Sequence, residues 1–408
     1  MAHQFNTLPK GFLGTPEPFT LHVPDTQLSE LLGLVKLSKI GPSTYWNQST
    51  DDGRFGISRE WLINAKEIWL STFNWRAHED SINSVPNFKT NVNDPEAGNV
   101  SIHFAALFSK RDDAIPILFL HGYPGSFLEF LPMMQILVGK YTPEKLPYHI
   151  IVPSLPDYGL SGGVGNKLEM TVERAAMIMN QLMEELGFGD GYIVQGGDLG
   201  SMLARIMSVE YEGCKALHLN MLNLNPGEAP STAASQDLTT EEEEHIQRGT
   251  AWQQTGFAYA LEHATRPSTI GLVISTNPLA LLSWIGEKYL EWADPRHPIP
   301  LDTILATVTL YWLTSTFPRS LYHASLAKNV LAGIPHPITK SKPLGYSVFP
   351  YDMAFVPEAW AREIYGNLVA YRRRGEGGHL GALEQPEALL SDVEEFIEKV
   401  HAVVQKGR

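Results

Sequence analysis

The sequence predicts an α/β fold in which a mostly parallel sheet follows an N-terminal meander and is interrupted by a helical cap. From about residue 100, apolar runs of strand length alternate with helical stretches, which is typical of βαβ units whose strands are buried on both faces. The alternation stops at about residue 225, stays helical to about residue 335, and then resumes. Such a cap is expected to lie over the carboxyl ends of the strands, where folds of this kind bind ligands.

These changes in pattern divide the chain into four parts. We expect an N-terminal meander at 1–99, a first part of the core at 100–224, the helical cap at 225–335 and a second part of the core at 336–408. In the meander, helical spacing of apolar residues predicts helices over 27–40 and 58–73. Neither helix has a strand of its own to cover, so both are expected to pack as a collar on a later part of the chain.

The predicted core elements follow in order. Strands are expected over 100–108, 115–120, 148–152, 192–194, 216–219 and 369–371, with helices over 171–186, 199–210 and 384–405. The last of these helices is amphipathic and has Pro386 near its start, a position that favours proline.

Composition excludes several classes of function. The chain of 408 residues has 45 acidic and 31 basic side chains, a formal net charge of −14, which disfavours nucleic acid and anionic lipid as partners. Its one cysteine, Cys214, cannot form an internal disulfide and is expected to be an inert buried thiol. The sequence shows no signal peptide and no long apolar span, so we expect a soluble, cytoplasmic protein without stable membrane insertion.

Residues 196–200 (GGDLG) have the pattern of a nucleophile elbow with Asp198 as the nucleophile. They follow a predicted strand and precede a predicted helix, and the glycines leave room for a strained turn. The amino end of the following helix would help to keep Asp198 ionised. The alternative, that Asp198 only caps this helix, does not account for the glycines.

An aspartate nucleophile restricts the chemistry. A carboxylate displaces a leaving group from sp3 carbon and becomes an ester, which water must then hydrolyse. This second step needs a general base and an oxyanion hole. The backbone N–H groups of Tyr123, in the motif HGYP at 121–124, and of Leu199 are the candidate oxyanion-hole donors.

The candidate base is His379, which follows Gly377 and Gly378 between the last strand and the closing helix. Asp352 lies on a loop between the cap and the final strand and is the preferred acid to orient His379. Glu376 is the competing acid, although it lies only three residues from His379 on a glycine loop. His218 lies inside a strand pattern and is expected in the core.

Together these residues resemble the epoxide hydrolases of the α/β-hydrolase superfamily, specifically the microsomal-type branch as found in soluble fungal enzymes. The resemblance extends over nearly the whole chain. It rests on Phe73-Asn74-Trp75-Arg76 with Glu79, Ile82, Asn83, Pro86 and Phe88, and on the motifs HGYPGS (121–126), GDLG (197–200), FPYD (349–352) and GGH (377–379). It implies an α/β-hydrolase fold and hydrolysis of a small neutral epoxide to a vicinal diol, through an ester on Asp198.

The resemblance also implies that cap tyrosines donate a proton to the leaving oxygen. Tyr259, in Phe257-Ala258-Tyr259-Ala260, matches the first of these. The second would stand at position 324, where this chain has Ala324. Tyr322 lies two residues earlier, about 200° away around a helix axis, and is a tentative substitute.

Rival functions remain open from the sequence. A haloalkane dehalogenase also uses an aspartate nucleophile but usually has tryptophan directly after it, where this chain has Leu199. A cyclase or isomerase derived from an epoxide hydrolase is kept open by Ala324. A non-catalytic binding protein would not need the nucleophile, base, acid and oxyanion-hole candidates. No cofactor or metal is expected, and a homodimer is possible.

Overall fold

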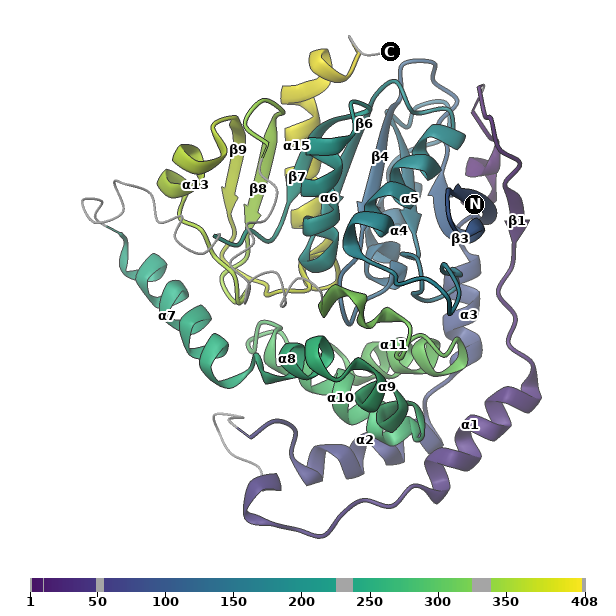
Figure 1. The fold of residues 1–408 in the computed structure, drawn as a ribbon, viewed down its shortest axis with the longest axis vertical. Coiled ribbons are helices and arrows are strands. Elements are labelled where there is room, and N and C mark those ends of the chain that lie inside the picture. Colours follow the sequence, from purple (N-terminus) through teal and green to yellow (C-terminus); the bar gives the residue numbers. More distant parts are fainter. Residues whose placement is uncertain (1, 10, 49–54, 225–237, 325–338, 406–408) are drawn as a thin grey trace.

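The computed structural model describes the chain except for residues 1, 10, 49–54, 225–237, 325–338 and 406–408 (Figure 1). Its centre is a nine-stranded sheet of order β1-β2-β3-β5-β4-β6-β7-β8-β9 within the described residues. The pairs β1–β2, β2–β3 and β3–β5 are antiparallel, and all the other pairs are parallel. The strands are β1 (Glu17–Phe19), β2 (Asn87–Asp94), β3 (Gly98–Leu107), β4 (Ile115–Leu120), β5 (Tyr148–Pro153), β6 (Tyr192–Gly196), β7 (Cys214–Leu219), β8 (Leu344–Val348) and β9 (Leu368–Arg373).

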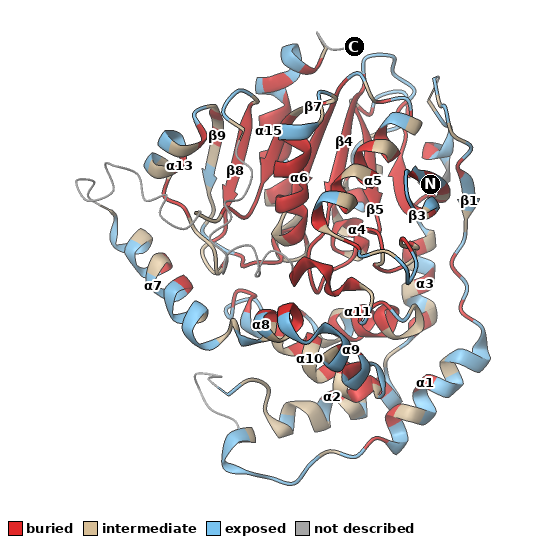
Figure 2. Ribbon diagram, viewed as in Figure 1, coloured by how far each residue is buried: buried red, intermediate tan, exposed pale blue. Residues whose placement is uncertain are grey.

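Helices cover both faces of this sheet. On one face, α5 (Val172–Glu185) packs on α6 (Asp198–Glu210); on the other, α15 (Pro386–Gln405) packs on α4 (Leu131–Lys140). Their apolar side chains fall into two separate buried clusters, one on each face. Figure 2 shows the central strands buried along most of their length. The short elements η3 (Phe127–Phe130), α13 (Glu358–Tyr365) and α14 (Gly381–Glu384) complete this core.

The cap lies across the end of the sheet at which the parallel strands finish (Figure 1). It consists of α7 (Thr240–Thr255), α8 (Ala258–Thr265), α9 (Pro267–Ser275), α10 (Pro278–Glu291), α11 (Leu301–Leu313) and the 3₁₀ turn η5 (Ser320–Ala324). The predicted cap boundaries at 224/225 and 335/336 adjoin or lie among residues outside those described. Within the described part, no single helix is long and apolar enough to cross a membrane, although α9 and α10, bent by 117° at their junction, pass the same test as a pair.

The N-terminal segment forms η1 (Ala2–Asn6), α1 (Asp25–Leu37), η2 (Tyr45–Asn47), α2 (Arg59–Ser71) and α3 (Trp75–Asn83). Helix α1 packs on α2 and on cap helix α10, as expected for a collar. Strands β1 and β2 in this segment were not predicted, and they extend the sheet. Strand β2 is polar because it is near the antiparallel edge, where alternate residues face solvent.

The six predicted strands and the predicted core helices are confirmed to within a few residues, and the sheet is mostly parallel as expected. Strand β8 was not predicted. Its sequence, LGYSV, includes a glycine and a serine in a fully buried strand. The glycine is needed there, since a Cβ on Gly345 would lie 2.6 Å from the His218 ring.

Candidate active site

Asp198 lies at the sharp turn between β6 and α6, with a positive φ of 46°. A side chain in this left-handed region is strained and is tolerated where the surroundings hold it. The surroundings here require glycine: a Cβ on Gly200 would lie 2.0 Å from the Leu120 carbonyl oxygen, and one on Gly196 would lie 2.4 Å from the Gly200 backbone. The turn therefore has the geometry expected of a nucleophile elbow.

The carboxylate of Asp198 meets the two backbone groups expected to form an oxyanion hole. The Tyr123 N–H donates to Oδ1 at 2.7 Å, and the Leu199 N–H also donates to this carboxylate. Burial alone would raise the pKa of Asp198, but His379 and the two N–H groups outweigh it and hold that pKa below its usual value. Asp198 is therefore ionised at neutral pH.

His379 links the nucleophile to a second carboxylate. Its Nδ1 lies 3.0 Å from Asp352 Oδ1, and its Nε2 lies 3.4 Å from Asp198 Oδ2. Burial lowers the pKa of His379, but the charges and hydrogen bonds of the two aspartates raise it well above its usual value. The competing acid Glu376 is exposed and lies 3.5 Å from His297 instead.

The loop carrying His379 is fixed by the cap. The His379 N–H donates to the Trp292 carbonyl at 2.9 Å, and the Gly377 N–H donates to Asp294 Oδ2 at 2.9 Å. Half-buried Glu384 accepts hydrogen bonds from the N–H groups of Gly378, Leu380 and Asp294. The end of α10 and the base are therefore held as one unit.

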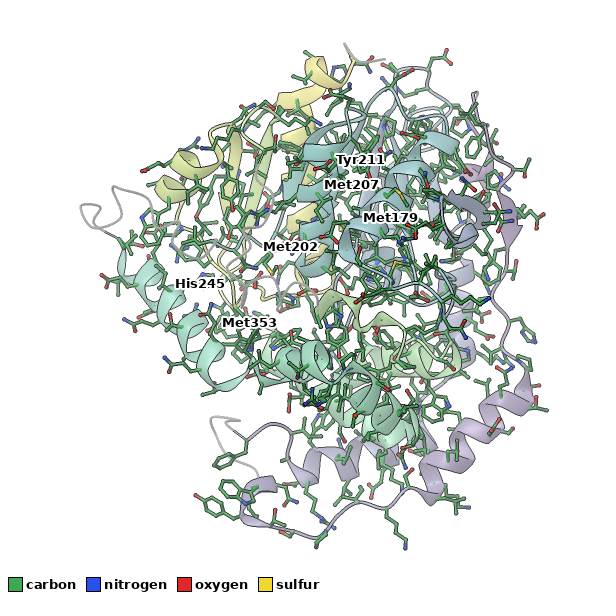
Figure 3. The ribbon with its side chains drawn as sticks, viewed as in Figure 1. Met179, Met202, Met207, Tyr211, His245 and Met353 are labelled. Atoms are coloured by element: carbon green, nitrogen blue, oxygen red, sulfur yellow. The ribbon has the colours of Figure 1, made fainter. Side chains whose placement is uncertain are left out.

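The loop carrying Asp352 is also in contact with the cap. His245, on α7, lies beside Met353 (Figure 3), and its Nε2 is 2.7 Å from the Asp352 carbonyl oxygen. The His245 ring stacks on Phe355 at 4.4 Å. Gly249, one turn further along α7, leaves space for Met353, whose carbonyl oxygen would lie 2.6 Å from a Cβ.

Tyr259 lies on α8 with its ring nearly parallel to that of Tyr123, at 6.1 Å between centroids. The Lys288 Nζ lies 4.7 Å from the Tyr259 ring centroid. Burial raises the pKa of Tyr259 well above its usual value, with a further contribution from the charge of Asp198. The phenol therefore keeps its proton and can donate it. Ala324 packs in the same small apolar cluster, so the side chain at position 324 does lie beside Tyr259.

Tyr322 is directed elsewhere. Its hydroxyl donates to the Pro156 carbonyl at 3.0 Å, and its ring packs edge-on against Tyr158. The tentative prediction that Tyr322 replaces the missing tyrosine is therefore not supported. The sequence already indicated the reason: Tyr322 lies two residues before position 324 and so points in a different direction. His323 stacks on Tyr123 at 4.0 Å, but its Nε2 lies 3.2 Å from His263 Nδ1 and its Nδ1 lies 2.9 Å from the Ser320 carbonyl oxygen.

Sequence reasoning missed Glu129, a buried glutamate on η3. A small cavity of about 10 Å³ is bordered by Glu129, Asp198 and His379, together with Asn220 and neighbouring main chain and apolar groups. The pattern Ser126-x-x-Glu129 could have drawn attention to this residue as a capping box. Nothing in that pattern shows that its carboxyl group reaches the nucleophile.

Comparison with known proteins agrees with this geometry. The family description "Epoxide hydrolase N terminus" matches residues 16–130, and "alpha/beta hydrolase fold" matches residues 115–285. The solved structure of an Aspergillus niger epoxide hydrolase is 47% identical and superimposes with a TM-score of 0.89, covering 97% of this chain and 99% of that one. The chain belongs to the epoxide hydrolase family.

Two curated relatives of this epoxide hydrolase extend the comparison. One, from Dothistroma septosporum, carries the name of an inferred epoxide hydrolase and is 44% identical, covering 97% of this chain and 92% of the relative. Epoxide hydrolase 1 of Sus scrofa is 28% identical, covering 93% of this chain and 88% of the relative. The resemblance stated from the motifs is thereby confirmed, and the non-catalytic alternative is excluded. Cys214 and His218 are buried in β7, as expected.

Proposed function

We propose that this enzyme hydrolyses a small neutral epoxide to a vicinal diol through a covalent ester on Asp198. The observation that carries the proposal is that the two oxygens of the Asp198 carboxylate have different partners. Oδ1 accepts the Tyr123 N–H at 2.7 Å, while Oδ2 lies 3.4 Å from His379 Nε2. This arrangement supports a role for one oxygen as the future oxyanion and for the other as the nucleophile.

In the first step, a carboxylate oxygen of Asp198 attacks an epoxide carbon, and the ring C–O bond breaks. Tyr259 donates its proton to the leaving oxygen, giving a hydroxyalkyl ester. An alkoxide is a poor leaving group, so a positioned phenol supplies the acid that the reaction needs. The proposed substrate is neutral, since Asp198 is the charge that must attack it.

Ester formation then lowers the pKa of His379. The negative charge of Asp198 is one of the causes that raise the pKa of His379, and an ester carries no such charge. The pKa of His379 therefore falls once the ester forms, its proton passes to the Tyr259 phenolate left by the first step, and the neutral ring can act as a base. Water attacks the Asp198 carbonyl carbon, His379 takes one proton, and the tetrahedral oxyanion accepts the N–H groups of Tyr123 and Leu199. The ester bond to the product breaks, the proton from His379 completes the diol, and the Asp198 carboxyl group passes its own proton to His379, which restores the starting state.

The two catalytic residues should fail at different steps. Asp198→Ala removes the nucleophile and should form no adduct with an epoxide such as styrene oxide. His379→Ala should accumulate the ester, because its role begins with hydrolysis. Intact mass spectrometry after mixing with substrate measures the adduct directly, and both variants should lack diol formation.

A single turnover in heavy-oxygen water provides an independent measurement. The oxygen added to the first diol should come from Asp198 and be unlabelled, while Asp198 gains the label. Full labelling of the first diol would mean that water attacks the epoxide directly, and would exclude the ester.

A further inference from the structure

Glu129 is a buried carboxyl group that the reaction above does not use. Its side chain is mostly enclosed, at 8% exposure, although burial of a carboxyl group without full pairing costs free energy. Oε1 accepts the Ser126 N–H at 3.2 Å, which completes a capping box at the start of η3. A capping role alone does not require burial, because such boxes are usually exposed, as the Thr239–Glu242 box of α7 is.

The neighbouring chain makes room for this carboxyl group. A Cβ on Gly125 would lie 1.5 Å from Glu129 Oε1, closer than any two unbonded atoms approach. Gly125 is itself held, since its carbonyl accepts the Tyr311 hydroxyl at 2.9 Å and its N–H donates to the Gly122 carbonyl. The turn after the oxyanion-hole residue Tyr123 therefore needs glycine to admit Glu129.

The space that Glu129 faces is the cavity it shares with Asp198 and His379. Its volume of about 10 Å³ is enough for about one water molecule. Its polar border groups are of the kind that bind water, and His379 Nε2 is buried, 3.4 Å from Asp198 Oδ2. The cavity thus joins a nucleophilic carboxylate, a base and a second carboxyl group around a site of the size of one solvent molecule.

The electrostatic coupling agrees with this proximity. Burial raises the pKa of Glu129 to about 8, with His379 acting to lower it and Asp198 to raise it. Glu129 therefore interacts with both residues of the proposed hydrolysis step. Either protonation state of a carboxyl group offers a lone pair to a water hydrogen.

We propose that Glu129 is a further catalytic residue, which holds the water that hydrolyses the ester. The proposal rests on the covalent function above. Glu129 accepts a hydrogen bond from one water hydrogen, and His379 Nε2 removes the other as the water oxygen bonds to the Asp198 carbonyl carbon. Glu129 gains and loses no proton in the step, and its effect is to orient the water.

The test is Glu129→Met in the full-length enzyme, with styrene oxide as substrate, because methionine has the length of glutamate without its carboxyl acceptor. Rapid-quench mass spectrometry separates the rate of ester formation from the rate of its hydrolysis. We expect hydrolysis to fall by about 10- to 100-fold, the loss that follows from one strong hydrogen bond, with ester formation changed by less than about 3-fold. The ester should consequently accumulate in the variant during turnover.

Glu79→Met is the matched control. Glu79 is a buried glutamate that accepts the Val23 N–H and the Trp75 indole N–H in the N-terminal segment, apart from the cavity. This variant should have a lower melting temperature and an unchanged ratio of the two rates. Gly125→Ala should reproduce the effect of Glu129→Met, because the added methyl group displaces the Glu129 carboxyl group without removing it. Glu129→Asp, which withdraws the carboxyl group by one methylene, serves if Glu129→Met does not fold.

The outcomes separate the two proposals. Equal losses in both rates for Glu129→Met, or unchanged hydrolysis, would overturn the role of Glu129 and leave it as a helix cap. Absence of any ester in both the unchanged enzyme and His379→Ala would instead overturn the covalent function itself.

Discussion

The protonation states of individual side chains in this site result from the balance between burial and the charges and hydrogen bonds of specific partners. Burial would leave Asp198 protonated and His379 neutral, yet their mutual contact and the hydrogen bond to Asp352 shift both pKa values the other way. Burial and the charge of Asp198 raise the pKa of Tyr259, which keeps its proton in place. A nucleophile that is ionised and an acid that is protonated therefore coexist in one enclosed volume.

Tyr259→Phe tests the acid directly. Because the phenol is the proposed donor to the epoxide oxygen, ester formation should slow by ~10²–10⁴-fold, while ester hydrolysis is unchanged. Stopped-flow tryptophan fluorescence with an epoxide substrate measures the first rate. An undiminished rate would contradict the assignment of Tyr259.

Tyr322→Phe is the matched comparison. Its hydroxyl is bound to the Pro156 carbonyl, so its loss should reduce stability by about 0.5–1.5 kcal/mol and leave both chemical rates nearly unchanged. Losses in ester formation equal to those of Tyr259→Phe would show that Tyr322 turns toward the substrate during the reaction.

At the level of elements, the elbow is formed by the close approach of α6 to β4. Gly200 touches the Leu120 carbonyl at the end of β4, which brings the start of α6 and the oxyanion-hole turn together. Leu120 is also the last residue before the turn that carries Tyr123. The spacing between the nucleophile and its N–H donors thus depends on helix-to-strand packing as much as on the local turn.

Gly200→Ala should therefore collapse both structure and activity. A Cβ 2.0 Å from the Leu120 carbonyl forces α6 away from β4, and overpacking of this kind costs roughly 1–3 kcal/mol or more. Urea unfolding and the rate of ester formation are the measurements. Gly139→Ala, in the last turn of α4 where a Cβ meets nothing within 4 Å, should be neutral or stabilising by up to ~1 kcal/mol.

Across the whole molecule, the cap is joined to the core at both catalytic loops. On one side, α7 contacts the Asp352 loop through His245; on the other, the end of α10 contacts the His379 loop through Trp292 and Asp294. Asp294 is buried and accepts bonds from Arg296 as well as from Gly377. A cap that is inserted late in the sequence is thus part of the support of the base and its acid.

Asp294→Asn should weaken this contact between the cap and the His379 loop. The substitution removes the charge that Arg296 and the Gly377 N–H both bind, which should cost about 1.5–3 kcal/mol of stability and slow ester hydrolysis. Asp113→Asn, in an exposed pair with Arg111, should change stability by less than ~1 kcal/mol. Similar losses from both variants would contradict a structural role of Asp294.

The stability that Asp294 contributes should also be lost at low pH. Burial raises the pKa of Asp294, but its hydrogen bonds to Arg296 and Gly377 hold that pKa down, at about 2. A carboxyl group with a lowered pKa stabilises the fold fully above its unfolded value of ~3.9, and this contribution is lost as pH falls toward about 2. The stability difference between the unchanged enzyme and Asp294→Asn should therefore shrink below about pH 4 in urea unfolding measurements.

The sequence was sufficient for the parts of the site that lie on one segment. Asp198 and His379 were found because each stands beside glycines that a tight turn or loop requires, after a readable strand. Glu129, Trp292 and Asp294 were not found, because their roles depend on contacts between segments about 70 to 250 residues apart in the chain. Strands β2 and β8 were missed for a related reason, since their polar residues and glycine fit neighbours that only the folded sheet provides.

The hydrogen bond from the His379 N–H to the Trp292 carbonyl has a consequence for the timing of catalysis. Any movement that lifts the end of α10 away from the sheet must either break this bond or carry the imidazole with it. If the bond holds, the His379 loop moves with the cap; if it breaks, that loop loses one of its supports. Ester hydrolysis is therefore expected to be fastest while the cap is closed.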